Sequence, residues 1–542
     1  MNTIKKITTK KFLLPLAALL LIFSFGCTRK FKDFNTNPNN ATEEMMQYDN
    51  LSTGVFFSQM EQNVFPVAQQ PAFGDEMYQV VQNLAGDVYS GYMGASNNWF
   101  GGSNNTTYNL TPGWYGQAFN RAFLSVMPAW LAIKKKTQGQ SSAQHIYALA
   151  QIIKVEAMHR TTDMYGPLPY FQFGSGSLTT PYDAQSAIYY SFFTDLDSAI
   201  NTLSTYVQNF PGLKPLAGYD LIYGGDYVKW IKFANSLKLR LAMRLAYVDP
   251  VKAQQYAEAA VNNSYGVFTT NDDNALLKTA NGVQIHNPLQ IICFNFDDVR
   301  MGANMESFLK GYADPRLPLM FNKAVADNNY HGIRNGINIT NKALYTTPFS
   351  TLNVAPETPI RWMSAAEMYF LKAEGAVRGW NMGGTAQTFY QTGIQTSFDQ
   401  WGAGSSTNYI ADSLSKPATY VDPSIASNNV NAGSSLSTII IKWKESTDAL
   451  ETKLEKILTQ KWIAMYPDGQ EAWTEFRRVR YPKVFPVVVN NSAGLINTTT
   501  QIRRLPFPQS EYQSNGSGVA TGIAVLGGAD NGGTKLWWDK KP

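Results

Sequence analysis

The sequence predicts a mostly α-helical protein in which long loops connect the helices and strands are few and short. Several segments repeat apolar residues at steps of three and four, the period of one helical face. The clearest strand candidate is a single run, VFPVVVN at 484–490. Long polar stretches separate the helical segments, and loops of such length usually carry function or are disordered: 94–112, 272–287, 327–359 and 402–437.

The chain opens with a segment typical of a secretion signal. Four lysines within the first eleven residues precede an apolar run at 12–25, which is shorter than the ~20 residues that span a bilayer. A Gly-Cys pair ends this run at Cys27, as in bacterial lipoprotein processing, although the two residues before the pair depart from the usual pattern. We expect residues 1–26 to be a lipoprotein signal peptide, residues 27–542 to be the mature domain, and Cys27 to carry the acyl anchor. An ordinary secretory signal is the alternative.

Composition excludes one class of partner. The formal charge of +5 falls to +1 once the four lysines of the signal segment are removed, so nothing supports nucleic-acid binding. Charged residues make up only 16% of the chain and aromatic residues 13%, which indicates a surface of neutral polar and aromatic groups.

The chain has two cysteines, so an acylated Cys27 would leave Cys293 without a disulfide partner. The apolar neighbours of Cys293 predict a buried, unreactive thiol.

Two segments, 186–207 and 226–250, carry the strongest helical pattern, and Pro250 marks the expected end of the second. A weaker pattern predicts further helices at 143–160, 252–262, 364–378, 385–398 and 448–465.

The segments at 364–378 and 385–398 lie on either side of a short Asn-Met-Gly-Gly connection. Ala386, Tyr390 and Gly393 match the small and aromatic positions in the second helix of a tetratricopeptide unit. The pair therefore predicts either one repeat of that kind or a lone helical hairpin.

The residues that usually mark an enzyme form no motif. The four histidines are scattered, and the sequence lacks the spacing of a zinc site, a nucleophile elbow or a nucleotide-binding loop. Adjacent aspartates such as Asp297–Asp298 could serve a secreted glycosidase only if two carboxylates stood about 5 to 9.5 Å apart in space. The segment at 33–44 resembles a calcium loop, but Pro38 occupies a position that needs a positive φ. We expect no catalytic residue, no cofactor and no metal ligand.

One loop joins aromatic residues to amides. In GASNNWFGGSNN, Trp99 and Phe100 lie beside Asn97 and Asn98, without the spacing that would place Trp99 in a helical core. A flat ring can stack on the CH face of a pyranose or on a peptide side chain, and neighbouring amides can hydrogen-bond to hydroxyls or backbone groups. These four residues are the first candidates for a ligand site. Two later loops supply weaker candidates: Phe296, Asp297 and Asp298, and then Tyr330 and His331.

Five motifs follow one another along the chain: DFNTNPNNAT at 33–42, RTTDMYGPLPY at 160–170, GGDYVKWIKFANSLKLRLAMR at 224–244, RWMSAAEMYFLKAEGAVRGW at 361–380 and QKWIAMYPDGQEAWTEFRRVRYP at 460–482. In these motifs and their order the chain resembles the SusD/RagB family of surface nutrient-binding lipoproteins of the Bacteroidetes. The resemblance implies a single, mostly helical SusD-like domain built on tetratricopeptide-like helix pairs, and a binding protein rather than an enzyme.

The resemblance also implies partners and a place in the cell. Family members pair with a SusC-like TonB-dependent transporter of the outer membrane, and act as a lid that delivers oligosaccharide or peptide for import. We therefore expect a lipid-anchored protein at the cell exterior that binds glycan, with peptide as the alternative ligand. Binding residues in this family come from variable loops and not from the shared motifs. The polar residues of the motifs are therefore expected to be buried and to hold the scaffold together: Arg240, Arg244, Arg477, Arg478, Asp163 and Tyr165.

Overall fold

The computed structural model describes residues 50–68 and 76–541. The predicted signal peptide, Cys27 and the asparagine-rich segment at 33–44 lie outside the described residues. From Thr53 onward the described chain belongs to one unit.

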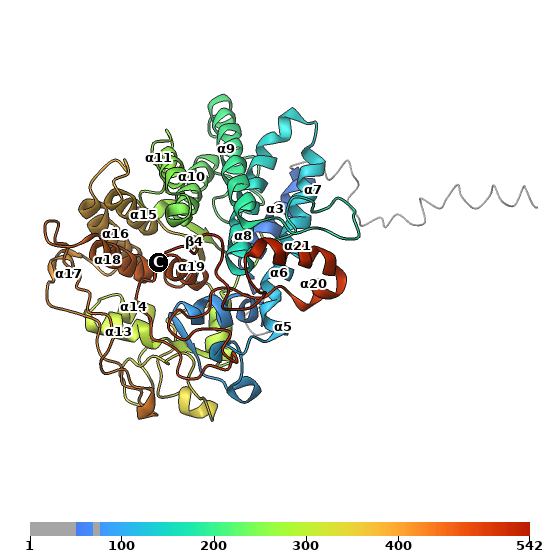
Figure 1. The fold of residues 1–542 in the computed structure, drawn as a ribbon. Helices are drawn as coiled ribbons and strands as arrows, with labels where there is room; N and C mark the ends of the chain where they lie inside the picture. The colour runs from blue at the N-terminus through green and yellow to red at the C-terminus, as the bar shows by residue number, and fades with distance from the viewer. Residues whose placement is uncertain (1–49, 69–75, 542) are drawn as a thin grey trace, which may run out of the picture. The chain divides into compact units, whose positions relative to one another are not determined.

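Helices dominate this unit, as the periodicity predicts (Figure 1). The α-helices in chain order are α3 (Leu51–Val64), α4 (Glu76–Tyr78), α5 (Pro112–Tyr115), α6 (Gln117–Arg121), α7 (Met127–Thr137), α8 (Gln144–Tyr165), α9 (Gln185–Asn209), α10 (Tyr227–Arg244), α11 (Pro250–Val261), α12 (Pro288–Gln290), α13 (Ala303–Gly311), α14 (Leu317–Met320), α15 (Ala365–Val377), α16 (Ala386–Trp401), α17 (Thr407–Ala411), α18 (Leu450–Met465), α19 (Gly469–Val479), α20 (Gln509–Ser514) and α21 (Gly516–Leu526). All seven segments predicted to be helical are helices.

The strands are short and form two-stranded antiparallel sheets. One sheet pairs β1 (Met93–Ala95) with β3 (Val299–Met301), and the other pairs β2 (Ala275–Leu277) with β4 (Ile360–Met363). The prediction of a strand at 484–490 was wrong, because this segment is irregular. Its Pro486 has no N–H to donate, and the N–H groups of Val488 and Val489 both donate to the Gly336 carbonyl instead of a strand ladder.

Side-chain caps explain where several helices begin. Asp226 accepts hydrogen bonds from the backbone N–H groups of the first turn of α10, and Asp468 accepts from Glu471 N at 3.3 Å at the start of α19. Thr385 caps α16 in the same way, and Gly402 ends α16 in a left-handed conformation with φ of 69°.

Consecutive helices pack in pairs, α8 with α9, α10 with α11, and α15 with α16 (Figure 1). In the last pair a Cβ on Gly393 would lie 2.9 Å from the ring of Phe370, so α16 can approach α15 this closely only because residue 393 has no side chain. The small position that suggested a tetratricopeptide unit therefore has a packing role, and the helical hairpin at this place is confirmed.

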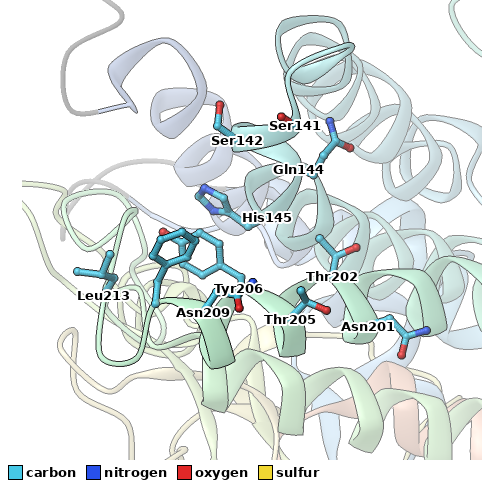
Figure 2. A pocket seen from close by; sticks show the side chains of 11 residues that line it. Ser141, Ser142, Gln144, His145, Asn201, Thr202, Thr205, Tyr206, Asn209 and Leu213 are labelled. Carbon is cyan, nitrogen blue, oxygen red and sulfur yellow. The ribbon is translucent and has the colours of Figure 1, made fainter.

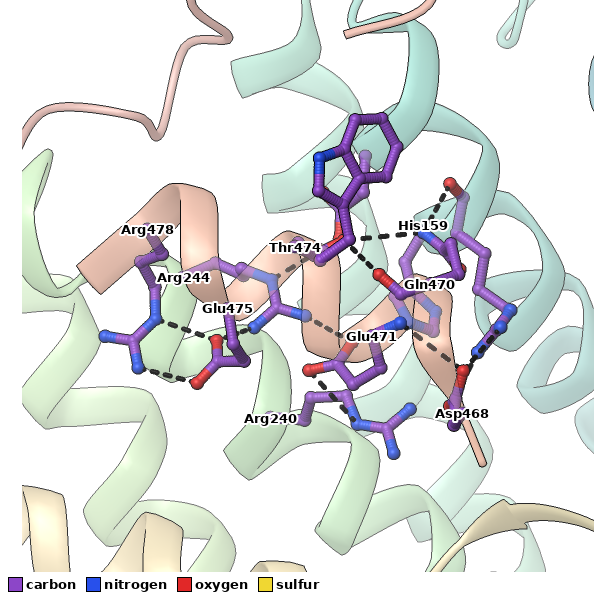
Figure 3. A network of polar contacts seen from close by, with 12 residues as sticks. His159, Arg240, Arg244, Asp468, Gln470, Glu471, Thr474, Glu475 and Arg478 are labelled. Carbon is purple, nitrogen blue, oxygen red and sulfur yellow. Dashed lines mark hydrogen bonds and ion pairs between the residues drawn. The ribbon is translucent and has the colours of Figure 1, made fainter. Parts of the chain in front are cut away.

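A buried network of ion pairs joins α8, α10, α15, α18 and α19. Figure 3 shows the part of it between α10 and α19. Arg240 Nη2 lies 2.6 Å from Glu367 Oε2, and Arg244 pairs with Glu471 and Glu475, all with side chains at most 4% exposed. Removing one partner of such a network leaves an uncompensated buried charge, which costs about 3–5 kcal/mol. The prediction that the shared arginines are buried ties is confirmed.

Candidate functional site

The Trp99 loop leaves the end of β1 and turns through an unusual backbone conformation. Residues Trp99–Gly102 form a short 3-10 turn in which Phe100, Gly101 and Gly102 all have positive φ, at 55°, 66° and 85°. Glycine adopts this region without cost, whereas Phe100 is strained there. The turn places the Phe100 ring in solvent, where it is 65% exposed.

Three rings gather at this turn and form what we call the aromatic cluster: Trp99, Phe100 and Trp114. Trp114 lies in α5 and meets Trp99 edge-to-face, with ring centroids 5.6 Å apart, and Phe100 at 5.4 Å. The packing partners of Trp114 are thus the two rings that the sequence singled out as ligand contacts. The cluster offers an exposed apolar surface whose rings hold one another in place.

Side-chain hydrogen bonds from the following turn hold the loop in place. The Asn104 amide donates to the Trp99 carbonyl at 3.0 Å, and the Thr107 hydroxyl donates to the Gly102 carbonyl at 2.7 Å. Asn104 also caps the turn at Asn105–Thr107, and both asparagines are buried. The amides of Asn104 and Asn105 therefore lie inside the loop, whereas those of Asn97 and Asn98 lie nearer to the surface.

The structure brings the first and second predicted clusters together. Because Ala95 pairs with Val299 in the β1–β3 sheet, the segments that extend from this end of the two strands are neighbours. The Asn97 amide donates to Asp298 Oδ1 at 2.9 Å, and the Ser96 N–H donates to the Asp298 carbonyl at 3.0 Å. Two loops separated by about two hundred residues in the sequence thus form one surface.

Asp298 organises this surface from a buried position. Its Oδ1 also accepts from Lys342 Nζ at 2.7 Å, and its Oδ2 accepts from Gln79 Nε2 at 3.0 Å. Lys342 Nζ further donates to the Phe296 carbonyl at 2.6 Å. A carboxylate that is 7% exposed and bonded to three different segments acts on a ligand only through the loops that it positions.

The neighbouring Asp297 has a different setting. Its side chain is 45% exposed and forms an ion pair with Arg300, and its φ is 56°. Phe296 is half-buried beside it. The two adjacent aspartates therefore differ in role, one holding the loops together and the other facing solvent.

Tyr330 and His331 lie at the other end of the β1–β3 sheet. The His331 backbone exchanges hydrogen bonds with Ser350, whose carbonyl accepts from Met301 N at the far end of β3. His331 Nε2 lies 2.8 Å from Asp327 Oδ2, and Tyr330 is half-buried. These two residues do not join the aromatic cluster, so they remain a separate and weaker candidate.

Sequence reasoning missed several residues of the site. Gln79 and Lys342 sit in segments without any distinguishing pattern, so only the fold reveals that they meet at Asp298. Phe294, which follows the buried Cys293, is 45% exposed. It lies in a π-helical turn at Ile291–Asn295, whose extra residue rotates the following side chains away from the expected face. Cys293 in the same turn is buried, as predicted, and burial raises the pKa of its thiol to about 11.

Two further properties of the described residues concern metal ions and membranes. Within the described residues, no cluster of histidine, cysteine and acidic side chains could hold a metal ion. No helix in the described part of the chain is both long enough and apolar enough to cross a bilayer.

Comparison with known proteins identifies the family. The model for SusD-like proteins, described as the SusD and RagB outer membrane lipoproteins, matches residues 33–539. The chain belongs to this family. Its members are outer membrane lipoproteins with a general role in glycan binding and nutrient uptake. Comparison with curated proteins found no match.

Solved structures agree with this assignment. A chitin-binding SusD homologue from Flavobacterium johnsoniae is 42% identical, with a TM-score of 0.86 over 90% of this chain and 99% of that one. A SusD homologue from Bacteroides vulgatus is 36% identical, with a TM-score of 0.84 over 91% and 99%. One from Bacteroides uniformis is also 36% identical, with a TM-score of 0.83 over 90% and 99%. The fold prediction is confirmed by all three.

Proposed function

We propose that this protein is a cell-surface lipoprotein that captures oligosaccharides with the aromatic cluster and delivers them to a SusC-like TonB-dependent transporter. The aromatic cluster carries the proposal, because Phe100 is held in solvent by a strained turn and backed by Trp114. Strain of this kind persists only where the surroundings enforce it, and it is concentrated at functional sites. The CH face of a sugar ring is the natural partner of an exposed aromatic face that is flanked by the neutral amides of Asn97 and Asn98.

The similarity to a chitin-binding protein suggests which glycan to test first. At 42% identity over most of both chains, N-acetylated oligosaccharides such as chitotriose and chitohexaose are the leading class. Peptide is the alternative within the same family. The site contains few unpaired charges, since Asp298 is bonded to Lys342 and Asp297 to Arg300. This neutrality favours a neutral glycan over a peptide with charged termini.

Titration calorimetry with purified protein tests the ligand. We expect chitooligosaccharides to bind the wild type, and Trp99→Ala and Phe100→Ala each to weaken binding at least tenfold. Phe171→Ala is the matched control, because Phe171 is 52% exposed and lies outside the aromatic cluster. If peptides bind and no glycan gives a binding signal, the peptide alternative replaces this proposal. Release of sugar products by pure protein would instead establish a glycosidase.

Anchoring and delivery need their own measurements. Mass spectrometry of the native N-terminus is expected to find acyl chains on Cys27, and an unmodified Cys27 would overturn the anchor. Co-purification from outer membranes is expected to recover a TonB-dependent transporter. A purely structural lid over that transporter predicts instead that Trp99→Ala leaves glycan uptake by living cells unchanged.

A further inference from the structure

A second surface with the chemistry of a sugar site lies among the helices. A cavity of about 670 Å³ opens between the start of α8 and the second half of α9 (Figure 2). This volume lies within the range of small-molecule sites, about 300–1,000 Å³. None of its lining residues belongs to the aromatic cluster or to the loops around Asp298.

One wall of the cavity is aromatic. The rings of His145 and Tyr206 are in contact, with centroids 4.1 Å apart and planes tilted by 37°, and Tyr206 contacts Phe210, one helical turn later, at 5.0 Å. His145 Nδ1 lies 2.7 Å from the hydroxyl of Tyr227, which holds the imidazole in place. Phe210 is 50% exposed, so the wall presents an open ring face to any occupant.

A stripe of neutral polar residues lines the same cavity. Asn201, Thr205 and Asn209 follow one another at four-residue steps along α9 and therefore share one helical face. Within the described part of the chain, no hydrogen bond uses the side chain of any of these three residues. Two amides and one hydroxyl thus remain available as donors and acceptors beside the aromatic wall.

The cavity carries no charge at neutral pH. Among the residues that the structure describes, no lysine, arginine, aspartate or glutamate lines it, and burial lowers the pKa of His145 to about 4, so the imidazole is neutral. An anionic or cationic ligand would find no counter-ion there. A peptide would bring polar termini and backbone groups that this short stripe leaves largely unpaired.

We propose that this cavity is a second carbohydrate-binding site, which takes the end of a neutral oligosaccharide between the Tyr206–Phe210 wall and the amides of Asn201 and Asn209. The proposal rests on the proposed function only for the class of ligand and not for its place of binding. A second site would let the protein hold a long glycan at two points, which raises avidity without new contacts at the first site.

Calorimetry on the full-length protein in detergent tests this second site, with chitohexaose, cellohexaose and a charged oligogalacturonate as probes. Wild-type protein is expected to show two classes of site for a neutral hexasaccharide. Thr205→Arg, which fills the cavity, is expected to remove the second class, and Asn209→Ala to weaken it at least fivefold. Thr194→Arg is the matched control, because Thr194 is an exposed residue of the same helix that does not line the cavity.

The outcomes separate the two proposals. Loss of all binding in Trp99→Ala, with none lost in Thr205→Arg, would overturn the second site and leave the first intact. If Thr205→Arg loses binding and Trp99→Ala keeps it, the result would support the second site and reject the aromatic cluster as the main site. Tighter binding of oligogalacturonate than of neutral probes, or equal losses in Thr205→Arg and Thr194→Arg, would also overturn the second site. Thermal unfolding of each variant shows that a loss of binding is not a loss of fold.

Discussion

Replacing Asp298 by asparagine tests whether one buried carboxylate holds the ligand surface together. The change keeps the shape of the side chain and removes its charge. The charge-assisted bond from Lys342 at 2.7 Å loses its anion, and a hydrogen bond to a charged group is worth about 1.5–3 kcal/mol. The Gln79 amide can rotate and present its oxygen, so it adds little to the cost. We therefore expect a loss of about 2–3 kcal/mol.

Calorimetric melting converts this loss into a temperature. For the unit from Thr53 to Pro542, an entropy of about 2.1 cal/mol/K per residue gives an unfolding entropy on the order of 1 kcal/mol/K. Asp298→Asn should therefore lower Tm by about 2–3 °C and weaken glycan binding several-fold, because the Asn97 tether loosens. The matched control is Asp297→Asn at the adjacent, 45% exposed carboxylate, which should cost under about 1 kcal/mol. Equal shifts in Tm for the two variants would refute the organising role of Asp298.

Three further predictions follow from other contacts. Trp114→Ala should weaken glycan binding about tenfold, because Trp114 supports the other two rings of the aromatic cluster; unchanged affinity in calorimetry would contradict this. Burial raises the pKa of Glu156 to about 8 and of Asp87 to about 7. Because the pKa of Glu156 is higher in the folded protein than in the unfolded chain, the stability that it contributes is complete below the unfolded value and is lost as pH rises to the folded value. The free energy of unfolding of Glu156→Gln should therefore increase relative to that of the wild type by about 1.4 kcal/mol per pH unit between pH 5 and 8. Urea unfolding at several pH values measures this gain, and a constant difference would refute it. Gly469→Ala should cost about 3 kcal/mol, because its Cβ would lie 2.3 Å from the Asp87 Cα, whereas Gly218→Ala faces open space and should change urea stability by under about 0.5 kcal/mol.

Most of the helical scaffold could be predicted because its pattern is local. In α9 and α10 the apolar residues recur at the helical period, and that period depends only on the segment itself. Helix α19 was not predicted, because its buried face is built from charged residues such as Arg477, Arg478 and Glu475. A pattern based on apolar residues does not register a helix whose core contacts are ion pairs.

The site was predictable only in part, for a related reason. Trp99 and Phe100 stood out because aromatic residues among glycines and asparagines lack a packing pattern. That the Asp298 loop lies beside them depends on the pairing of β1 with β3, whose strands are three residues long and carry no signal of their own. The grouping of Tyr330 and His331 away from this surface depends on the same pairing.

The construction of the Trp99 loop makes it a replaceable part. Its ends are held by β1 on one side and by the Asn104 turn on the other, while the ion-pair network that secures the helices involves none of its residues. Residues 98–102 could therefore be exchanged for a segment of equal length with different aromatic residues while Asn97 keeps its bond to Asp298 and the rest of the molecule keeps its stability. If the aromatic cluster binds the ligand as we propose, altering these five residues would change which nutrient the protein captures, and a laboratory could use the same five positions to redirect what the cell collects.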